Sequence, residues 1–320
     1  MTFKLSVYSS NNKKMLSEYE KNMMADKTIL NHKVQEINAS CIKGEMRSGS
    51  YKIDMGGGVF DVLFCRNLNK TKKRLFVFLS GGREPSNNGF KDKLPRFKRW
   101  SFYKYLDGDT LVIDDPMYRD WPDLQIGWFY GDKNHSYCTE VVNLVKLWAK
   151  NLSIGSERDI CFYGSSSGGY AAVYCAACFK NASCVAINPQ LILNNDAYKS
   201  TFERIVNVKF SDDDIYNRNK LLALMDGYCG KMLIVQNIQD FSHCKNHFVP
   251  FCRGYGFNPK FGITSYNRII TYVYNADGGH VAYENKYMVS MLLKLIYDDI
   301  SVNDIYINFS FIWGLCKNKS

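Results

Sequence analysis

A serine lies at the centre of the glycine-flanked pentapeptide Gly164-Ser165-Ser166-Ser167-Gly168. The apolar run 160–163 precedes it, and a segment rich in small residues follows it. A sharp turn from strand to helix strains the central residue, so the positions two residues away must be very small. The turn also presents the hydroxyl at a helix N-terminus, where free N–H groups favour negative charge. We predict that Ser166 is a nucleophile and that the Ser167 N–H is an oxyanion donor; the alternative is a turn that serves only close packing. Ser165 and Ser167 are weaker candidates for the nucleophile, because either choice would displace the glycines.

The base and the acid that orients it should follow the serine along the chain. His280 lies in a glycine-rich turn, Asn275-Ala276-Asp277-Gly278-Gly279-His280, after the last expected strand. A histidine with an ordinary pKa near 6.5 suits proton transfer at neutral pH. Asp240 follows the apolar run 232–235 by five residues, so its carboxylate can fix the tautomer of His280. Asp277 and Asp115 stay open as alternative acids.

Two further histidines, His243 and His247, follow Asp240 and are four residues apart. This spacing allows metal ligation on a helix, but no third ligand is evident in the sequence. We favour contact with substrate, or a plain surface position, and predict no metal.

The second oxyanion donor should come from Ser80-Gly81-Gly82-Arg83, which follows the apolar run 75–79. Glycine lets the backbone approach a bound carbonyl closely, and paired N–H donors there stabilise a tetrahedral intermediate. We predict the N–H of Gly82, with Gly81 as the next choice. A basic cluster follows this loop, and it could hold the phosphates or other anionic groups of a substrate through Lys91, Lys93, Arg96 and Arg99.

These residues need a sheet to bring them together. From about residue 51, short apolar runs alternate with helical periodicity, which is typical of a mainly parallel sheet covered on both faces. The expected strands are 51–55, 59–65, 75–79, 110–113, 160–163, 184–187, 232–235 and 269–273. The expected helices are 139–151, 168–180 and 281–297. Residues 189–230 break this rhythm with two weaker helical patterns, 197–206 and 213–225, and we interpret them as a small cap. Residues 51–320 would then form one α/β domain, preceded by an N-terminal extension, 1–50, of unclear structure.

The bulk composition excludes several classes of protein. The 320 residues are 46% hydrophobic and 22% charged, which is ordinary for a globular domain rather than a disordered chain. The formal charge of +10 favours anionic partners, but no nucleic-acid recognition motif is present. No window reaches the roughly 18 apolar residues of a membrane span; the apolar tail 305–316 fits a packed segment, and peripheral membrane association stays open. Eleven cysteines without a secretory leader predict a reducing, cytoplasmic location.

The serine turn, the late aspartate and the final Gly-Gly-His resemble the α/β-hydrolase superfamily over residues 50–300. Further motifs are similar to bacterial α/β-hydrolase-fold acetyltransferases that modify capsular or other surface glycans: Leu79-Ser80-Gly81-Gly82-Arg83, Pro95-Arg96-Phe97-Lys98-Arg99-Trp100, Asp115-Pro116, Gly127-Trp128-Phe129-Tyr130-Gly131, Asn188-Pro189 and Gln236-Asn237. This resemblance implies acetyl-CoA as donor and a sugar hydroxyl, on a glycan that can be anionic, as acceptor. We expect substrate contacts from Arg83, Arg96, Arg99, Trp128 and His243.

The leading functional prediction is acyl transfer through an acyl-Ser166 intermediate. An esterase would use the same residues, with water in place of the acceptor hydroxyl. A third prediction is a catalytically inactive fold that serves as a binding module. The sequence alone does not separate transfer from hydrolysis.

Overall fold

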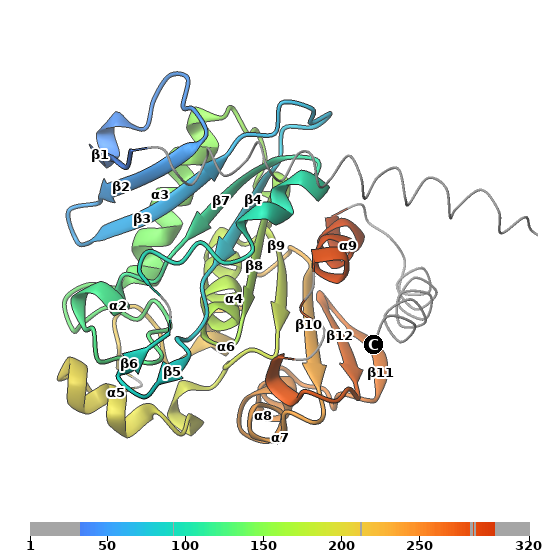
Figure 1. Ribbon diagram of the computed structural model, residues 1–320. Helices are drawn as coiled ribbons and strands as arrows, with labels where there is room; N and C mark the ends of the chain where they lie inside the picture. The colour runs from blue at the N-terminus through green and yellow to red at the C-terminus, as the bar shows by residue number, and fades with distance from the viewer. Residues whose placement is uncertain (1–32, 92, 212, 282–283, 285, 298–320) are drawn as a thin grey trace, which may run out of the picture.

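The computed structural model describes residues 33–297, except 92, 212, 282–283 and 285 (Figure 1). Within these residues a ten-stranded sheet forms the centre of the molecule, in the order β1-β2-β3-β7-β4-β8-β9-β10-β12-β11. Its strands are β1 (Gln35–Asn38), β2 (Gly49–Asp54), β3 (Val59–Cys65), β4 (Leu75–Leu79), β7 (Asp109–Ile113), β8 (Ile160–Ser165), β9 (Ser183–Ile187), β10 (Met232–Asn237), β11 (Gly262–Tyr266) and β12 (Ile269–Tyr274). A separate two-stranded ribbon pairs β5 (Pro85–Ser86) with β6 (Gly89–Phe90).

The six strands from β7 to β12 through the middle of the sheet are parallel. Every residue of β4, β8, β9 and β10 is buried, which agrees with the apolar runs that make up most of each strand. The polar residues stand at strand ends: Ser165, Ser183, Gln236 and Asn237. Leu79 is in register with Gly164, and Ser165 with Ile187. The carboxyl ends of these strands therefore reach one edge of the sheet together, and the loops that leave this edge carry the candidate site residues.

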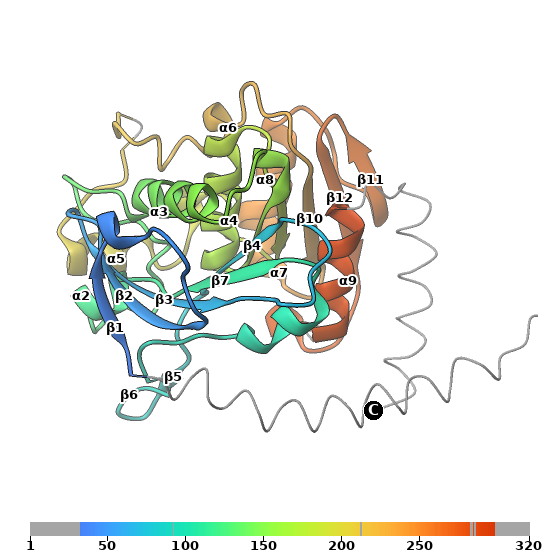
Figure 2. The same ribbon diagram turned by 90° about the horizontal axis from the view of Figure 1, so that it is seen from above.

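Helices cover both faces of the sheet (Figures 1 and 2). One face packs against α3 (Tyr137–Asn151), α4 (Ser167–Phe179) and the segment formed by η5 (Cys244–Phe248) and α8 (Val249–Gly254). The other face packs against η2 (Trp100–Tyr105) and α9 (Lys286–Tyr297). Three further short helices in the described residues are α2 (Met117–Asp120), η1 (Ala39–Cys41) and η3 (Glu157–Asp159). None of the helices in the described part of the chain is both long and apolar enough to cross a bilayer.

The segment 189–230 holds η4 (Leu193–Asn195), α5 (Lys199–Val206) and α6 (Leu221–Leu224). It is tied to the body of the domain by buried contacts. The Tyr170 hydroxyl donates to the carbonyl of Arg218 at 2.6 Å. The Arg218 guanidinium donates in turn to the carbonyls of Tyr130 and Asp132, both at 2.7 Å, and pairs with Asp214. These contacts attach the part of the segment around residues 214–218 to the body of the domain.

The expected strands are present, but the helices and edges differ from prediction in places. The pattern 213–225 is helical only at Leu221–Leu224, because turns occupy the residues before it. The last helix begins at Lys286 rather than at residue 281, after the short helix η6 (Gly279–Val281). Strands β1 and β11 were not expected, and β1 joins part of the N-terminal extension to the sheet. The apolar tail 305–316 and residues 1–32 lie outside the described residues.

Candidate active site

Ser166 lies at the turn between β8 and α4, with φ 56° and ψ −124°. This conformation is strained for a residue with a side chain, and the backbone holds it: the Ser166 N–H donates to Ile187 at 3.0 Å. A Cβ on Gly164 would lie 2.0 Å from the carbonyl oxygen of Gly168, and one on Gly168 would lie 2.4 Å from that of Leu79. Both glycines are therefore required by close backbone contacts, as the pentapeptide predicts.

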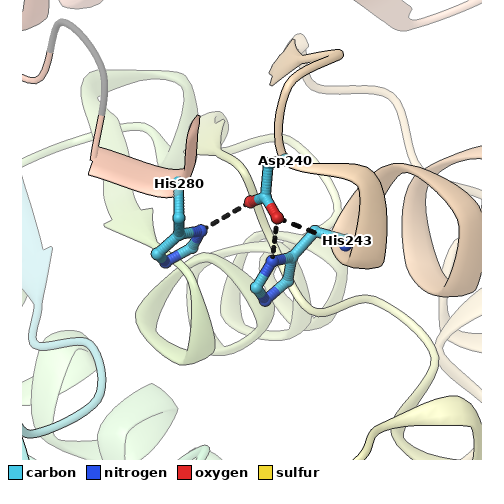
Figure 3. Close-up of side chains that lie close together, drawn as sticks. All are labelled: Asp240, His243 and His280. Atoms are coloured by element: carbon cyan, nitrogen blue, oxygen red, sulfur yellow. Dashed lines mark hydrogen bonds and ion pairs between the residues drawn. The ribbon is translucent and has the colours of Figure 1, made fainter. Parts of the chain in front are cut away.

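His280 and Asp240 meet at the carboxyl edge of the sheet (Figure 3). The Nδ1 atom of His280, on η6, lies 2.6 Å from Oδ2 of Asp240, which caps α7 (Phe241–His243). The Asp240 side chain is 7% exposed and that of His280 is 35% exposed. The other aspartates considered lie elsewhere: Asp277 is exposed, and Asp115 is buried, where its carboxylate accepts the N–H groups of Met117 and Phe129. Asp240 is thus the acid in contact with His280.

Two buried asparagines fix the loop that carries His280. The Asn188 side chain donates to the His280 carbonyl at 2.8 Å, and its oxygen accepts the Asn237 N–H at 2.8 Å. The Asn237 side chain donates to the carbonyls of Ala276 and Gly279, each at 2.8 Å. Both side chains are fully buried. The sequence assigned them no role, and the only signal for them is their position at, or directly after, the carboxyl end of a buried strand.

His243 shares Asp240 with His280. Its Nδ1 atom lies 2.8 Å from Oδ1 of Asp240, and the two imidazole rings stack with centroids 4.4 Å apart and planes 20° apart (Figure 3). Burial would raise the pKa of Asp240, but hydrogen bonds from His243 and His280 bring it well below its usual value. Burial lowers the pKa of His243, against the hydrogen bond to Asp240 that raises it. At neutral pH we therefore infer an ionised Asp240 beside a neutral His243.

An ionised carboxylate only accepts hydrogen bonds, so Nδ1 of both rings carries a proton. The Nε2 atom of the neutral His243 ring is therefore an acceptor. Asp240, His243 and His280 also have ligand atoms close enough to surround a metal ion. The Oδ–Nδ1 distances of 2.6 and 2.8 Å fit hydrogen bonds, whereas two ligands of a tetrahedral zinc ion lie about 3.3 Å apart. His247 does not join this set: its Nδ1 accepts the Ile192 N–H, and its Nε2 lies 3.2 Å from Asp196.

A cavity of about 710 Å³ opens over these residues. Of the predicted site residues, those that line it are Ser166, His280, His243, Gly81, Gly82, Arg83 and Arg99. Arg83 stacks on Phe90, while Arg99 pairs with Glu284 and donates to the Ser165 hydroxyl. The segment 189–230 contributes Gln190, Asp196, Ala197 and Tyr198 to the wall.

Two residues predicted to contact substrate, Trp128 and Arg96, have buried side chains and do not line the cavity. Trp128 is fully buried; its indole N–H donates to Gln190 at 2.8 Å, and its ring packs against Phe202. Arg96 is 4% exposed, and its guanidinium contacts Asp114 and backbone carbonyls. Ser167 is also fully buried, but the predicted donor there is a backbone N–H in the first turn of α4, where no intrahelical acceptor is available.

The fold matches those of known enzymes. No family model matches the sequence, and no curated protein matches it. The capsule O-acetyltransferase of Neisseria meningitidis serogroup A superposes with a TM-score of 0.55 at 17% identity, covering 81% of this chain and 99% of that one. A mutant of that enzyme in complex with CoA gives a TM-score of 0.53 at 16% identity, over the same shares. Est1E from Butyrivibrio proteoclasticus gives 0.50 at 17%, covering 77% and 96%.

With its order of parallel strands and the turn at Ser166, the chain has the α/β-hydrolase fold. It resembles capsule O-acetyltransferases in that fold, as the sequence motifs predict. At these identities the likeness shows the fold alone.

Proposed function

We propose that the protein is a serine acyltransferase that forms an acyl-Ser166 intermediate. The observation that carries the proposal is a shared cavity: Ser166 and His280 both line it, and His280 is hydrogen-bonded to the buried carboxylate of Asp240. A strained serine at a helix N-terminus, with an oriented imidazole in the same cavity, is the arrangement that nucleophilic acyl chemistry needs.

In the proposed reaction, His280 takes the proton of the Ser166 hydroxyl as the oxygen bonds to the carbonyl carbon of an ester or thioester. The oxyanion is held by backbone N–H groups, for which Gly82, Gly81 and Ser167 are the candidates. The tetrahedral intermediate then expels the thiol or alcohol, which receives the proton from His280. An acceptor hydroxyl next gives its proton to His280 and attacks the acyl carbon. As the bond between the acyl carbon and Oγ of Ser166 breaks, His280 returns that proton to Oγ, and the acyl group leaves on the acceptor.

The cavity lining offers groups for two kinds of substrate. Arg83, Lys98 and Arg99 line it and suit the phosphates of a donor such as acetyl-CoA. Gln125, Gln190, Tyr198 and His243 also line the cavity and offer neutral hydrogen-bonding groups. Since Nε2 of His243 is an acceptor, we assign it to a hydroxyl of the acceptor. A glycan hydroxyl is the proposed acceptor, supported by the fold shared with a capsule O-acetyltransferase; a cytoplasmic location stays a prediction.

Hydrolysis is the second candidate function, because the same fold occurs in Est1E and because water can replace the acceptor hydroxyl. The test is to mix the protein with acetyl-CoA and measure its intact mass and the release of CoA, with and without a glycan acceptor. Transfer predicts one added acetyl group on Ser166, absent in Ser166→Ala, and CoA release that depends on the acceptor.

The other outcomes are equally distinct. Turnover of p-nitrophenyl acetate without any effect of the acceptor would identify an esterase. A Ser166 that reacts neither with acetyl-CoA nor with a fluorophosphonate would leave the binding-module alternative.

A further inference from the structure

The buried guanidinium of Arg96 contacts the loop that is proposed to hold the oxyanion. Its Nη2 donates to the Gly81 carbonyl at 2.7 Å, and its Nη1 donates to the Gly82 carbonyl at 2.9 Å. The Tyr118 hydroxyl donates to the same Gly81 carbonyl at 3.1 Å. Burial raises the pKa of Tyr118 well above its usual value, so this hydroxyl remains a donor. Two consecutive carbonyls of one glycine-rich loop are thus fixed from the same direction.

The Arg96 side chain is itself held in place. Asp114 accepts the Arg96 backbone N–H at 2.7 Å and lies 3.4 Å from its Nη2. The Ser80 hydroxyl donates to the same carboxylate at 2.7 Å. The Arg96 guanidinium also lies over the Tyr118 ring. This set ties the end of β7, the segment around residue 96 and the start of the glycine loop into one buried unit.

The direction of the loop N–H groups follows from peptide geometry. In a planar trans peptide, the carbonyl of one residue and the N–H of the next point in opposite directions. Fixing the Gly81 carbonyl on the Arg96 side therefore aims the Gly82 N–H the other way. Gly82 lines the cavity and Arg96 does not, so the Gly82 N–H, which points away from Arg96, faces the cavity. Gly81 lies beside the nucleophile, because a Cβ built on it would be 3.7 Å from Cβ of Ser166. The next N–H along the loop, that of Arg83, already donates to Gln125 at 2.7 Å.

We propose that Arg96 is a positioning residue: its guanidinium, by binding the Gly81 and Gly82 carbonyls, holds the Gly82 N–H in the direction that stabilises the oxyanion at Ser166. Arg96 touches no substrate, and it acts through the backbone. A charged donor on a peptide carbonyl also polarises that peptide and strengthens its N–H as a donor. The inference rests on the proposed acyl chemistry of Ser166.

The test uses Arg96→Lys and Arg96→Met in the full chain. A lysine keeps the charge but lacks the planar fork that reaches both carbonyls. We measure p-nitrophenyl acetate turnover and inhibition by a trifluoromethyl ketone, which adds to the serine and mimics the oxyanion. Removing an oxyanion donor costs about 10²–10³ in kcat, so Arg96→Lys should lower kcat about 10–100-fold with KM nearly unchanged. Affinity for the ketone should fall by the same factor.

Arg218 provides the matched control. It is equally buried, at 3% exposed, pairs with an aspartate and binds backbone carbonyls, but it does not line the cavity or contact the glycine loop. Arg218→Lys should lower the melting temperature by an amount similar to Arg96→Lys while keeping kcat and ketone affinity. If Arg96 variants fail to fold, Tyr118→Phe removes the second hydrogen bond to the Gly81 carbonyl, together with the Tyr118 contact to the Ser167 side chain. It should lower kcat and ketone affinity together by a few-fold.

Two results would overturn the inference. The first is wild-type ketone affinity in Arg96→Lys, or in Tyr118→Phe where the Arg96 variant does not fold. The second is a loss of activity that follows the melting temperature equally in the Arg96 and Arg218 variants. In both cases a wild-type protein that reacts with the ketone leaves the proposed function standing. A wild type that reacts with neither the ketone nor p-nitrophenyl acetate would overturn the proposed function and this inference together.

Discussion

Replacing Asp240 with asparagine tests the hydrogen bonds that this carboxylate accepts from His280 and His243. The carboxylate serves two imidazoles, with Oδ2 on His280 and Oδ1 on His243. Asparagine has one carbonyl oxygen, so it can accept from one Nδ1 only, and its NH₂ group faces the other ring. Even in the orientation that keeps the hydrogen bond to His280, the variant loses the negative charge that stabilises the imidazolium formed during proton transfer.

The magnitude follows from Coulomb's law. Charge centres about 4 Å apart, at the effective dielectric constant of about 20 that suits a partly buried pair, interact by about 4 kcal/mol. Each 1.36 kcal/mol is about tenfold in rate, so Asp240→Asn should lower kcat by about 10³-fold. If the carboxamide instead turns its NH₂ group toward His280, the imidazole is driven to the wrong tautomer and the loss approaches about 10⁴.

The assay is steady-state and burst-phase hydrolysis of p-nitrophenyl acetate, with Asp277→Asn as the matched control. Asp277 is exposed and close to His280 along the chain, and its substitution should leave the rate within about twofold of wild type. A loss below about tenfold in Asp240→Asn would refute the reasoning. So would an equal loss in both variants, which would mean that the charge acts at long range rather than through the contact.

Three further predictions concern the framework of the site. In Gly164→Ala the new Cβ lies 2.0 Å from a backbone oxygen, so we expect a melting temperature lower by about 10 °C or more and little labelling of Ser166 by a fluorophosphonate. Gly155→Ala, in which nothing lies within 4 Å of the added atom, should match wild type. Equal labelling of the two variants would contradict the strain argument. Trp128→Phe loses a buried hydrogen bond and should reduce the free energy of unfolding by about 1–3 kcal/mol in urea titrations, whereas a changed KM would favour direct substrate contact. Folding lowers the pKa values of both Asp240 and His243, so each group contributes stability at neutral pH that is lost as pH falls through its folded value. Urea titrations should therefore show the free energy of unfolding declining below about pH 6.5. In His243→Gln this decline should be shallower between about pH 6.5 and 5.

The central strands and the serine turn could be predicted because their signals are local. A strand buried on both faces is apolar over most of its length, as β4 is throughout and β8 is over residues 160–163. The edge strands β1 and β11 were missed for the opposite reason. Their residues are mostly exposed or half-buried, so backbone pairing with a neighbour determines them, and the sequence carries little hydrophobic pattern.

The pattern 213–225 shows how local hydrogen bonds override helical periodicity. The Asp214 side chain accepts the Arg218 N–H at 2.7 Å, and Asn217 adopts a positive φ of 54°. Side chains that bind nearby backbone groups in this way compete with helix formation. Apolar spacing alone does not reveal this competition, so the sequence predicted a helix where turns occur.

Arg96 and Trp128 were predicted to contact substrate, but neither lines the cavity, because their residue types suit buried structural roles as well. Arginine and tryptophan are common in binding sites, and nothing in the basic cluster 91–99 distinguishes the member that turns inward. What decides the burial of Arg96 is distant in sequence: Asp114, directly after β7, and Tyr118 in α2. The same applies to Asn188 and Asn237, whose role depends on the loop around residue 280.

The charges near Ser166 are largely compensated, in spite of the formal charge of +10. Arg99 is paired with Glu284, and Arg96 with Asp114. Salt at physiological strength screens exposed charges beyond about 8 Å, so distant lysines contribute little to the field at the hydroxyl. In the proposed reaction we therefore expect the oxyanion to be stabilised chiefly by oriented backbone N–H groups, whose dipoles are fixed before the reaction and need no reorganisation. This is why the buried contacts that set the direction of the glycine loop matter more to the chemistry than the number of cations around the cavity.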